Sequence, residues 1–241
     1  MANARNSAAF VRRVAASGAT QRAGGAWRRW RARWLLGLLL LVGALVAVIP
    51  GLRHAALQSA GWALVASDPL QAADVIVIAV DGGAAEVLEA ADLVQRGIAA
   101  RVAVFSTPPD AITQEFSRRG VQYANRATQA QRMLKELGVA QVERVPQTVA
   151  GSNDEAAALP AWCDSNGFRT VIFLSTADHS RRVRRMLARS MAGHATRVLV
   201  RYSSYASFRP DSWWLSRDGQ RAEFIESEKM LIEVLAHPLS G

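Results

Sequence analysis

Between residues 74 and 236, short runs of β-branched residues alternate with segments of helical periodicity. The first run, DVIVIAV (74–80), shows no alternation of polar and apolar residues, which is typical of a strand buried on both faces. It is followed by AAEVLEAADLVQR (84–96), a segment with helical spacing that stops at Gly97. The same signals predict further strands at 101–106, 141–145, 170–175 and 197–201. They predict helices for two segments within 111–137 and for 152–166, 179–191 and 222–236.

Strands that alternate with helices in this way favour an α/β fold. We predict one domain over residues 74–238, a Rossmann-like open and mainly parallel sheet of about five strands with helices on both faces. In such sheets, ligands bind beyond the carboxyl ends of the strands, in the crevice where the strand order reverses. The residues that follow each strand are therefore the candidates for a functional site.

The N-terminal part has the composition of a membrane anchor. From Trp34 to Leu52 there is no charged residue, and 19 residues of helix at about 1.5 Å each nearly match a hydrocarbon core of about 30 Å. We predict a transmembrane helix over 34–52, followed by a juxtamembrane connection over 53–73. The alternatives are a cleaved signal peptide and a helix buried within the folded protein.

The positive charge is concentrated ahead of this segment. Residues 1–33 contain eight arginines and no acid, and they account for most of the net charge of +9. Under the positive-inside rule, this N-terminus is cytoplasmic, the chain crosses the inner (cytoplasmic) membrane once, and the domain is extracytoplasmic. The rest of the chain has 21 of the 29 basic residues and all 20 acidic ones, so it is nearly neutral. We therefore do not expect it to bind nucleic acid. The single cysteine, Cys163, allows no internal disulfide and is expected to pack as a small apolar group in a helix.

Asp81, Gly82 and Gly83 follow the first strand and open a helix. The glycines allow a ligand to approach the backbone closely, and the helix N-terminus offers N–H groups to an anion. A plain strand-to-helix turn is the alternative, because the dinucleotide pattern G-x-G-x-x-G is absent from this turn. Further candidate ligand-binding residues follow the second and fourth strands: Ser106, Ser175 and Thr176.

His179 and Arg182 follow the fourth strand on one face of the next helix. At a helix N-terminus the imidazole is expected to be neutral and able to accept a proton, and the arginine could hold an anionic oxygen. Glu155 opens the helix after the third strand and is the second candidate for acid–base chemistry, although Ser152 and Glu155 also fit a capping box. The other arginines of the helix over 179–191 are expected to form a solvated basic face: Arg181, Arg184, Arg185 and Arg189.

Two other kinds of site are not favoured. A serine hydrolase would pair His179 with Ser106 or Ser175, but the G-x-S-x-G motif is absent. A metal site would need more ligands than Asp81, Asp178 and His179 provide. We therefore expect no metal, and no motif identifies a cofactor.

Several stretches share an order of motifs with a known family. They are the turn and helix over 82–97, SNDEA (152–156), LSTADHSRRV (174–183), and Trp213 or Trp214 followed by Glu226 and Lys229. Through these motifs the chain resembles, over residues 72–236, the SanA/YdcF-like family of bacterial proteins, a domain of unknown function. It departs from the family after the second strand, where prolines replace a Gly-Gly pair, and at Asp81, which replaces a glycine.

The resemblance implies a role in cell-envelope or peptidoglycan-related processes, and many members carry one N-terminal membrane segment. We therefore expect a membrane-anchored domain that acts on or senses an anionic or phosphorylated envelope metabolite, that is, a small anionic or nucleotide-like ligand. Glu155 and His179 would carry the acid–base chemistry. The alternatives are a non-catalytic ligand-binding or regulatory module and a partner-docking surface over residues 201–214, a segment that could instead simply cover the sheet edge.

Overall fold

The computed structural model describes residues 27, 30–31, 33–38, 40–122 and 124–238. The chain forms two compact units, Met1–Ala56 and Leu57–Gly241. Of the eight arginines predicted to mark a cytoplasmic N-terminus, Arg31 and Arg33 are described, and the other six lie outside the described residues.

The continuous helix predicted for residues 34–52 is two helices. The first runs from Arg33 to Val48 and the second, α2, from Pro50 to Leu64, with a bend of 104° between them. Pro50 lacks an N–H group and disfavours helical geometry at the preceding residue, so the chain breaks at Ile49. Among the described residues, no single helix has the length and hydropathy of a membrane span, whereas this bent pair has them when taken together.

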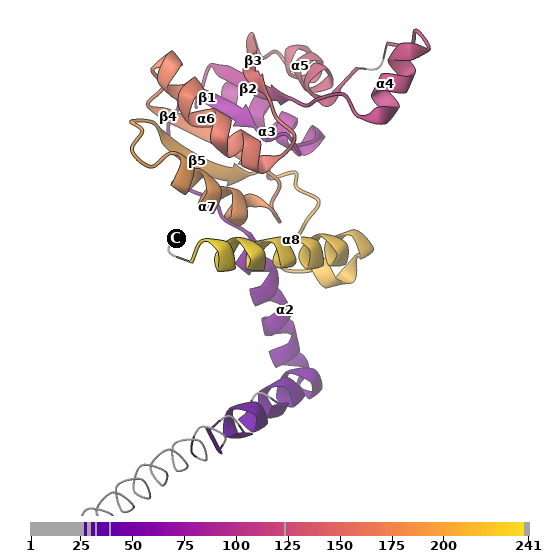
Figure 1. Cartoon of the computed structure of the whole chain (residues 1–241), viewed down its shortest axis with the longest axis vertical. Helices are drawn as coiled ribbons and strands as arrows, with labels where there is room; N and C mark the ends of the chain where they lie inside the picture. The colour runs from indigo at the N-terminus through magenta and orange to yellow at the C-terminus, as the bar shows by residue number, and fades with distance from the viewer. Residues whose placement is uncertain (1–26, 28–29, 32, 39, 123, 239–241) are drawn as a thin grey trace, which may run out of the picture. The chain divides into compact units, whose positions relative to one another are not determined.

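The second unit contains a five-stranded sheet in which every neighbouring pair is parallel (Figure 1). The strands are β1 (Val75–Ile78), β2 (Arg101–Ser106), β3 (Gln141–Thr148), β4 (Thr170–Ser175) and β5 (Arg197–Tyr202). Their order is β3-β2-β1-β4-β5, which confirms the predicted α/β fold. β3 runs three residues further than predicted, through Pro146. An edge strand tolerates proline because one side of its backbone has no neighbouring strand to bond.

Helices cover both faces of this sheet. α6 (Ser152–Asn166) and α7 (Ser180–Ser190) lie on one face, and α3 (Ala84–Gln95) and α5 (Arg126–Glu136) lie on the other. The unit also contains α4 (Ala111–Arg118), a 3₁₀ turn at Trp213–Leu215, and α8 (Arg217–Ala236). α6 ends at Gly167, whose φ of 66° is the left-handed conformation expected for a helix-ending glycine. α8 begins five residues earlier than predicted, because the Ser216 side chain accepts a hydrogen bond from the N–H of Gly219 and caps the helix.

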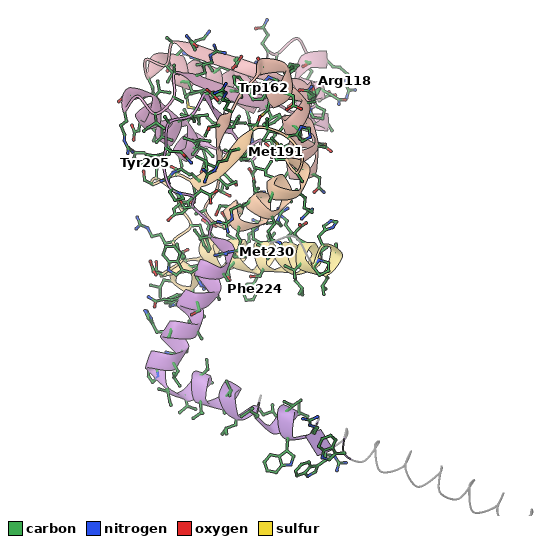
Figure 2. All side chains as sticks on the ribbon, turned by 90° about the vertical axis from the view of Figure 1, so that its left-hand side faces the viewer. Arg118, Trp162, Met191, Tyr205, Phe224 and Met230 are labelled. Atoms are coloured by element: carbon green, nitrogen blue, oxygen red, sulfur yellow. The ribbon has the colours of Figure 1, made fainter. Side chains whose placement is uncertain are left out.

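β1 separates two hydrophobic clusters. Val75 and Val77 pack with residues of α6 and α7, whereas Ile76 and Ile78 pack with residues of α3 and α5. This explains why the sequence of the strand shows no polar alternation. Trp162 and Met191 belong to the first cluster (Figure 2), as does Cys163. Cys163 is buried as predicted, and burial raises the pKa of its thiol to about 12.

Residues 57–73 belong to the same compact unit as the sheet. The end of α2 packs against the segment that precedes α8, where the indole of Trp213 donates a hydrogen bond of 2.7 Å to the carbonyl of Leu57. The other buried members of this third cluster are Leu64, Val65, Ala177 and Phe208. Trp213 is therefore an internal side chain, although it belongs to the aromatic segment considered above as a docking surface.

The arginines of α7 that were predicted to be merely solvated instead tie the helix to its neighbours. Arg181 donates to the carbonyls of Trp62 and Val65, because the chain before β1 passes over the start of α7. Arg184 bonds Asp68, Arg185 donates to the carbonyl of His237, and Arg189 bonds Glu233. The prediction of a purely solvated face is wrong.

The strand order reverses between β1 and β4. In an open parallel sheet the crevice lies beyond the carboxyl ends of such a pair. The residues that follow β1 and β4, namely 79–83 and 176–179, therefore meet at one edge of the sheet.

Candidate functional site

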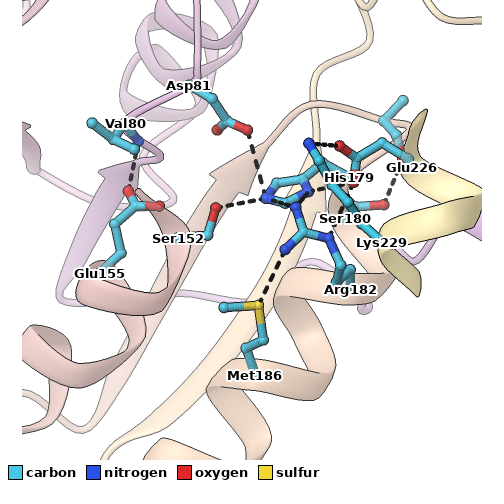
Figure 3. A network of polar contacts seen from close by, with 11 residues as sticks. Val80, Asp81, Ser152, Glu155, His179, Ser180, Arg182, Met186, Glu226 and Lys229 are labelled. Carbon is cyan, nitrogen blue, oxygen red and sulfur yellow. Dashed lines mark hydrogen bonds and ion pairs between the residues drawn. The ribbon is translucent and has the colours of Figure 1, made fainter. Parts of the chain in front are cut away.

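The imidazole of His179 is the centre of a polar network at this edge (Figure 3). The side chain is nearly fully buried, with 3% of its surface exposed. Its Nε2 atom lies 2.9 Å from the hydroxyl of Ser152 and 3.5 Å from a carboxylate oxygen of Asp81. Its Nδ1 atom lies 2.9 Å from a carboxylate oxygen of Glu226. Four segments that are distant in sequence thus meet at one ring.

Ser152 reaches the ring because it is the first residue of α6 and follows β3 closely. Gly151 precedes the helix as its N-cap residue, and its carbonyl accepts the N–H groups of Asp154 and Glu155. The capping box predicted from Ser152 and Glu155 is therefore wrong. With the cap at Gly151, the local cap partner is Asp154, whose carboxylate accepts the N–H of Ala150.

Glu226 comes from α8 and closes the network on the other side of the ring. Its carboxylate accepts hydrogen bonds from Lys229 at 2.6 Å and from Nε of Arg182 at 3.1 Å, in addition to His179. Burial opposes the charge, but the hydrogen bonds from His179 and Lys229 and the nearby positive groups outweigh it and lower the pKa of Glu226 to about 2. Glu226 is ionised at neutral pH.

Arg182 lies over the face of the imidazole. One terminal nitrogen of Arg182, Nη2, is 2.7 Å from Nδ1 and 3.4 Å from Nε2. An atom that lies in the plane of the ring, along the lone-pair direction of Nδ1, would be much farther from Nε2, so Nη2 lies above the ring. The in-plane position at Nδ1 therefore belongs to Glu226. An ionised carboxylate only accepts, so a hydrogen bond to Glu226 requires the hydrogen on Nδ1. In the neutral tautomer with that hydrogen, the lone pair of Nε2 faces the Ser152 hydroxyl.

Glu155 sits on the opposite side of the network, against the end of β1. One carboxyl oxygen accepts the N–H of Val80 at 2.5 Å, and the other is buried without a hydrogen-bond partner among the described residues. Burial and the nearby charge of Asp81 raise the pKa of Glu155 to about 8, against the opposing effect of the Val80 hydrogen bond. Glu155 is a neutral acid at pH 7.

The glycines after β1 contribute packing more than anion binding. A Cβ atom on Gly82 would lie 2.8 Å from a methyl carbon of Ile78 and 2.9 Å from the carbonyl oxygen of Ala79. The N–H of Gly83, predicted as a donor to an anion, instead donates to the carboxylate of Glu86 at 2.7 Å. An anion at this helix end would compete with an internal acid.

The remaining predicted residues lie around the network rather than in it. Thr176 lines a pocket of about 390 Å³ together with Asp81, Gly83 and Asp178, on the side of the turn after β1. Ser175 is fully buried, and its hydroxyl has no partner among the described residues. Ser106 ends β2, which β1 separates from β4. The hydroxyl that contacts His179 is that of Ser152, not that of Ser106 or Ser175.

An open pocket of about 390 Å³ lies beside Ser152, and we call it the Ser152 pocket. Its lining consists of the first turn of α6 and two cationic side chains: Gly151, Ser152, Asn153, Asp154, Arg182 and Lys229. The N–H groups of Ser152 and Asn153 have no intrahelical partner, because they belong to the first turn. Free N–H groups at a helix N-terminus together with cations favour an anion.

Ser152, Glu226 and Lys229 are members of the network that the sequence does not assign to the site. The sequence pattern favours a capping role for Ser152, and Glu226 and Lys229 enter only through the resemblance. The signal for Ser152 was its place between a strand and a helix, the same place that singled out Asp81 and His179. Among the described residues, no group of three or more His, Cys, Asp and Glu side chains is arranged to hold a metal ion.

No family model matches the chain, and neither a curated protein nor a solved structure matches it. The network and its pocket therefore carry the functional argument.

Proposed function

We propose that this domain binds a small anionic ligand in the Ser152 pocket and acts on it through His179. The observation that supports this most directly is the position of the His179–Ser152 contact. It lies at a pocket lined by a helix N-terminus, Arg182 and Lys229. A neutral imidazole beside a hydroxyl can accept a proton, and the cations can hold anionic oxygens.

The charged and titratable groups around the ring have different roles. Arg182 and Lys229 supply positive charge to the pocket while also bonding Glu226. The carboxyl of Glu155 accepts the N–H of Val80, the residue before Asp81, and its pKa of about 8 allows it to give up a proton near neutral pH. This arrangement suits a hydrolase or transferase that acts on a phosphorylated or otherwise anionic envelope metabolite, as the SanA/YdcF-like resemblance implies.

A non-catalytic ligand-binding or regulatory module is the second candidate. It is favoured by one observation: both cations of the pocket already bond Glu226, so an incoming anion rearranges an existing network. Incubation with candidate envelope metabolites, followed by mass spectrometry, separates the two. Chemically altered ligand supports the enzyme, and bound but unaltered ligand supports the module.

We further propose that residues 34–52 anchor the chain in the cytoplasmic membrane, with the N-terminus inside and the folded domain outside. The apolar side chains of this segment are exposed, for example Leu40 at 67% and Val48 at 78%, which supports a surrounding of lipid. Protease treatment of spheroplasts should digest the domain while sparing a tag on residue 1. Protection of the domain would contradict the orientation.

Binding of inorganic phosphate, measured by calorimetry, tests the proposed ligand class. We expect Arg182→Ala to weaken binding by about tenfold, which corresponds to one charge-assisted hydrogen bond. Arg184→Ala, on the same helix but bonded to Asp68, is the matched control and should bind normally. Equal binding by wild type, Arg182→Ala and Arg184→Ala would overturn the assignment, as would a failure of both phosphate and organic phosphates to bind.

A further inference from the structure

Three side chains of the network form a line through the imidazole. The Ser152 hydroxyl is 2.9 Å from Nε2, and the Glu226 carboxylate is 2.9 Å from Nδ1, the opposite nitrogen of the ring (Figure 3). A nucleophile, a base and a group that orients the base stand in this relation in enzymes that use covalent catalysis.

The hydrogen-bond directions also agree with this role. Glu226 can only accept, so it holds the hydrogen of the ring on Nδ1. Nε2 then accepts the hydrogen bond donated by the Ser152 hydroxyl, which is the arrangement needed to remove the proton of that hydroxyl. Arg182 donates to the same Glu226 oxygen that Nδ1 contacts, and Lys229 donates to the other oxygen.

Ser152 differs from the other serines near the ring. Ser180 is buried, its hydroxyl donates to the carbonyl of Ala177, and it accepts the N–H of Ala66. Ser152 is half-buried, opens onto the Ser152 pocket, and stands between a strand and a helix. The residue after it, Asn153, also lines the pocket, and its N–H belongs to the first helical turn. A backbone N–H in that position is suited to stabilise an oxyanion.

We propose that Ser152, His179 and Glu226 form a catalytic triad that transfers the acyl group of an anionic carboxylic ester to water or to another hydroxyl. The proposal rests on the proposed function, because it uses the same pocket. Arg182 and Lys229 would lie beside the anionic part of the ester. Glu226 is a positioning residue, since it acts through the ring.

The reaction proceeds in two balanced halves. Ser152 Oγ attacks the ester carbonyl carbon as its proton passes to Nε2 of His179, and the N–H of Asn153 faces the oxyanion. The carbon–oxygen bond to the alcohol then breaks, and the alcohol leaves with the proton from Nε2. In the second half, water attacks the acyl-serine ester and gives a proton to Nε2. That proton returns to Ser152 Oγ as the carboxylic acid is released, and no oxidant or reductant is needed.

An alkyl fluorophosphonate tests the nucleophile on the purified full chain, because the reagent phosphonylates an activated serine and releases fluoride. We expect one adduct, located on Ser152 by peptide mass spectrometry and absent from Ser152→Ala. His179→Ala should slow labelling at least about 100-fold. Ser165→Ala, on the same helix, is the control and should label at the wild-type rate. Absence of the Ser152 adduct, or an unchanged rate in His179→Ala, would overturn the triad.

The pH dependence of the labelling rate tests whether Glu226 positions His179. In Glu226→Gln the midpoint of the labelling rate against pH should move to lower pH, because removal of a carboxylate at Nδ1 disfavours the imidazolium. The other charged groups near the ring, Asp81, Asp178 and Arg182, remain in this variant, and so does Lys229, which bonds Glu226 in the wild type. A slower rate with an unmoved midpoint would assign Glu226 a structural role only and contradict the triad.

Phosphate binding by Ser152→Ala separates the two proposals. Where Ser152 fails to label but phosphate binds with the expected dependence on Arg182, the triad is wrong and the proposed function stands. Where phosphate fails to bind as well, the proposed function fails with it. Because Ser152 is half-buried and its substitution removes one oxygen, Ser152→Ala should fold, and its circular dichroism spectrum verifies this in the same sample.

Discussion

Two buried glutamates on opposite sides of His179 differ in charge at neutral pH, because one carboxyl group is protonated and the other is ionised. Glu155, against the end of β1, has one backbone hydrogen bond and a raised pKa of about 8. Glu226, on α8, has three side-chain partners and a lowered pKa of about 2. Burial raises the pKa of both carboxyl groups, and at Glu155 it is the largest cause. At Glu226 the number and positive charge of the donors outweigh it.

The same difference sets opposite effects of pH on stability. Glu226 is more acidic in the folded state, so its stabilisation is present above its unfolded pKa of about 4.5 and is lost as the pH falls toward 2. Glu155 is less acidic when folded, so its contribution to stability is lost as the pH rises from about 4.5 through 8.

Removal of the ionised acid should have the largest effect. Glu226→Ala leaves Arg182 and His179 without their buried partner, and we expect it to lower the free energy of unfolding by about 3 kcal/mol at pH 7. Urea denaturation measures the change. A loss below about 0.5 kcal/mol would mean that solvent already satisfies these groups and that the network is not a buried one.

Neutralisation of Glu155 should act in the opposite direction, by an amount that grows as the pH rises from about 4.5 to 8. Glu155→Gln removes the cost of ionising a buried acid, so the variant should be more stable than wild type at pH 9 by on the order of 2 kcal/mol and should lose this advantage at pH 5. Thermal melting across this pH range provides the measurement. An advantage that is independent of pH would contradict a raised pKa at Glu155.

Gly82→Ala disturbs the turn after β1, which lies on the Glu155 side of the ring. The new methyl group would meet Ile78 and the carbonyl of Ala79, and the turn must shift, which displaces the Val80 N–H from Glu155. Overpacking of this kind typically costs about 1–2 kcal/mol. Chemical denaturation should show this loss, while the fluorophosphonate reaction at Ser152 should slow less than in His179→Ala. A loss confined to the reaction, with stability unchanged, would place Gly82 in the Ser152 pocket instead.

Lys229→Met should have the smallest effect, about 0.5 kcal/mol, because half of this side chain is exposed and Glu226 keeps Arg182 and His179 as partners. Acid titration of the unfolding transition tests whether the pKa of Glu226 stays below its ordinary value in this variant. An effect as large as that of Glu226→Ala would show that Lys229 alone keeps the acid ionised.

The sequence predicted the sheet well because its strongest signals are local. The apolar run of β1 lacks polar alternation since both of its faces are buried, and Gly167 ends α6 where the chain turns left-handed. Placement of His179 and Asp81 at one edge followed from the rule for parallel sheets.

The network itself could not be predicted in full, because its bonds join residues far apart in sequence. The local pattern S-x-x-E assigned Ser152 and Glu155 to each other, but their partners are His179 and Val80. Only the packing of α8 against α7 reveals that Glu226 faces the imidazole, since no local pattern connects residues 47 positions apart.

The protonation of the two ring nitrogens of His179 decides whether the imidazole can accept the Ser152 proton, and ¹⁵N NMR of the full chain measures it. We expect hydrogen on Nδ1, an unprotonated Nε2 toward Ser152, and a change in the Nε2 shift when phosphate enters the Ser152 pocket. Hydrogen on Nε2, or a spectrum that is unchanged by Glu226→Gln, would contradict this expectation.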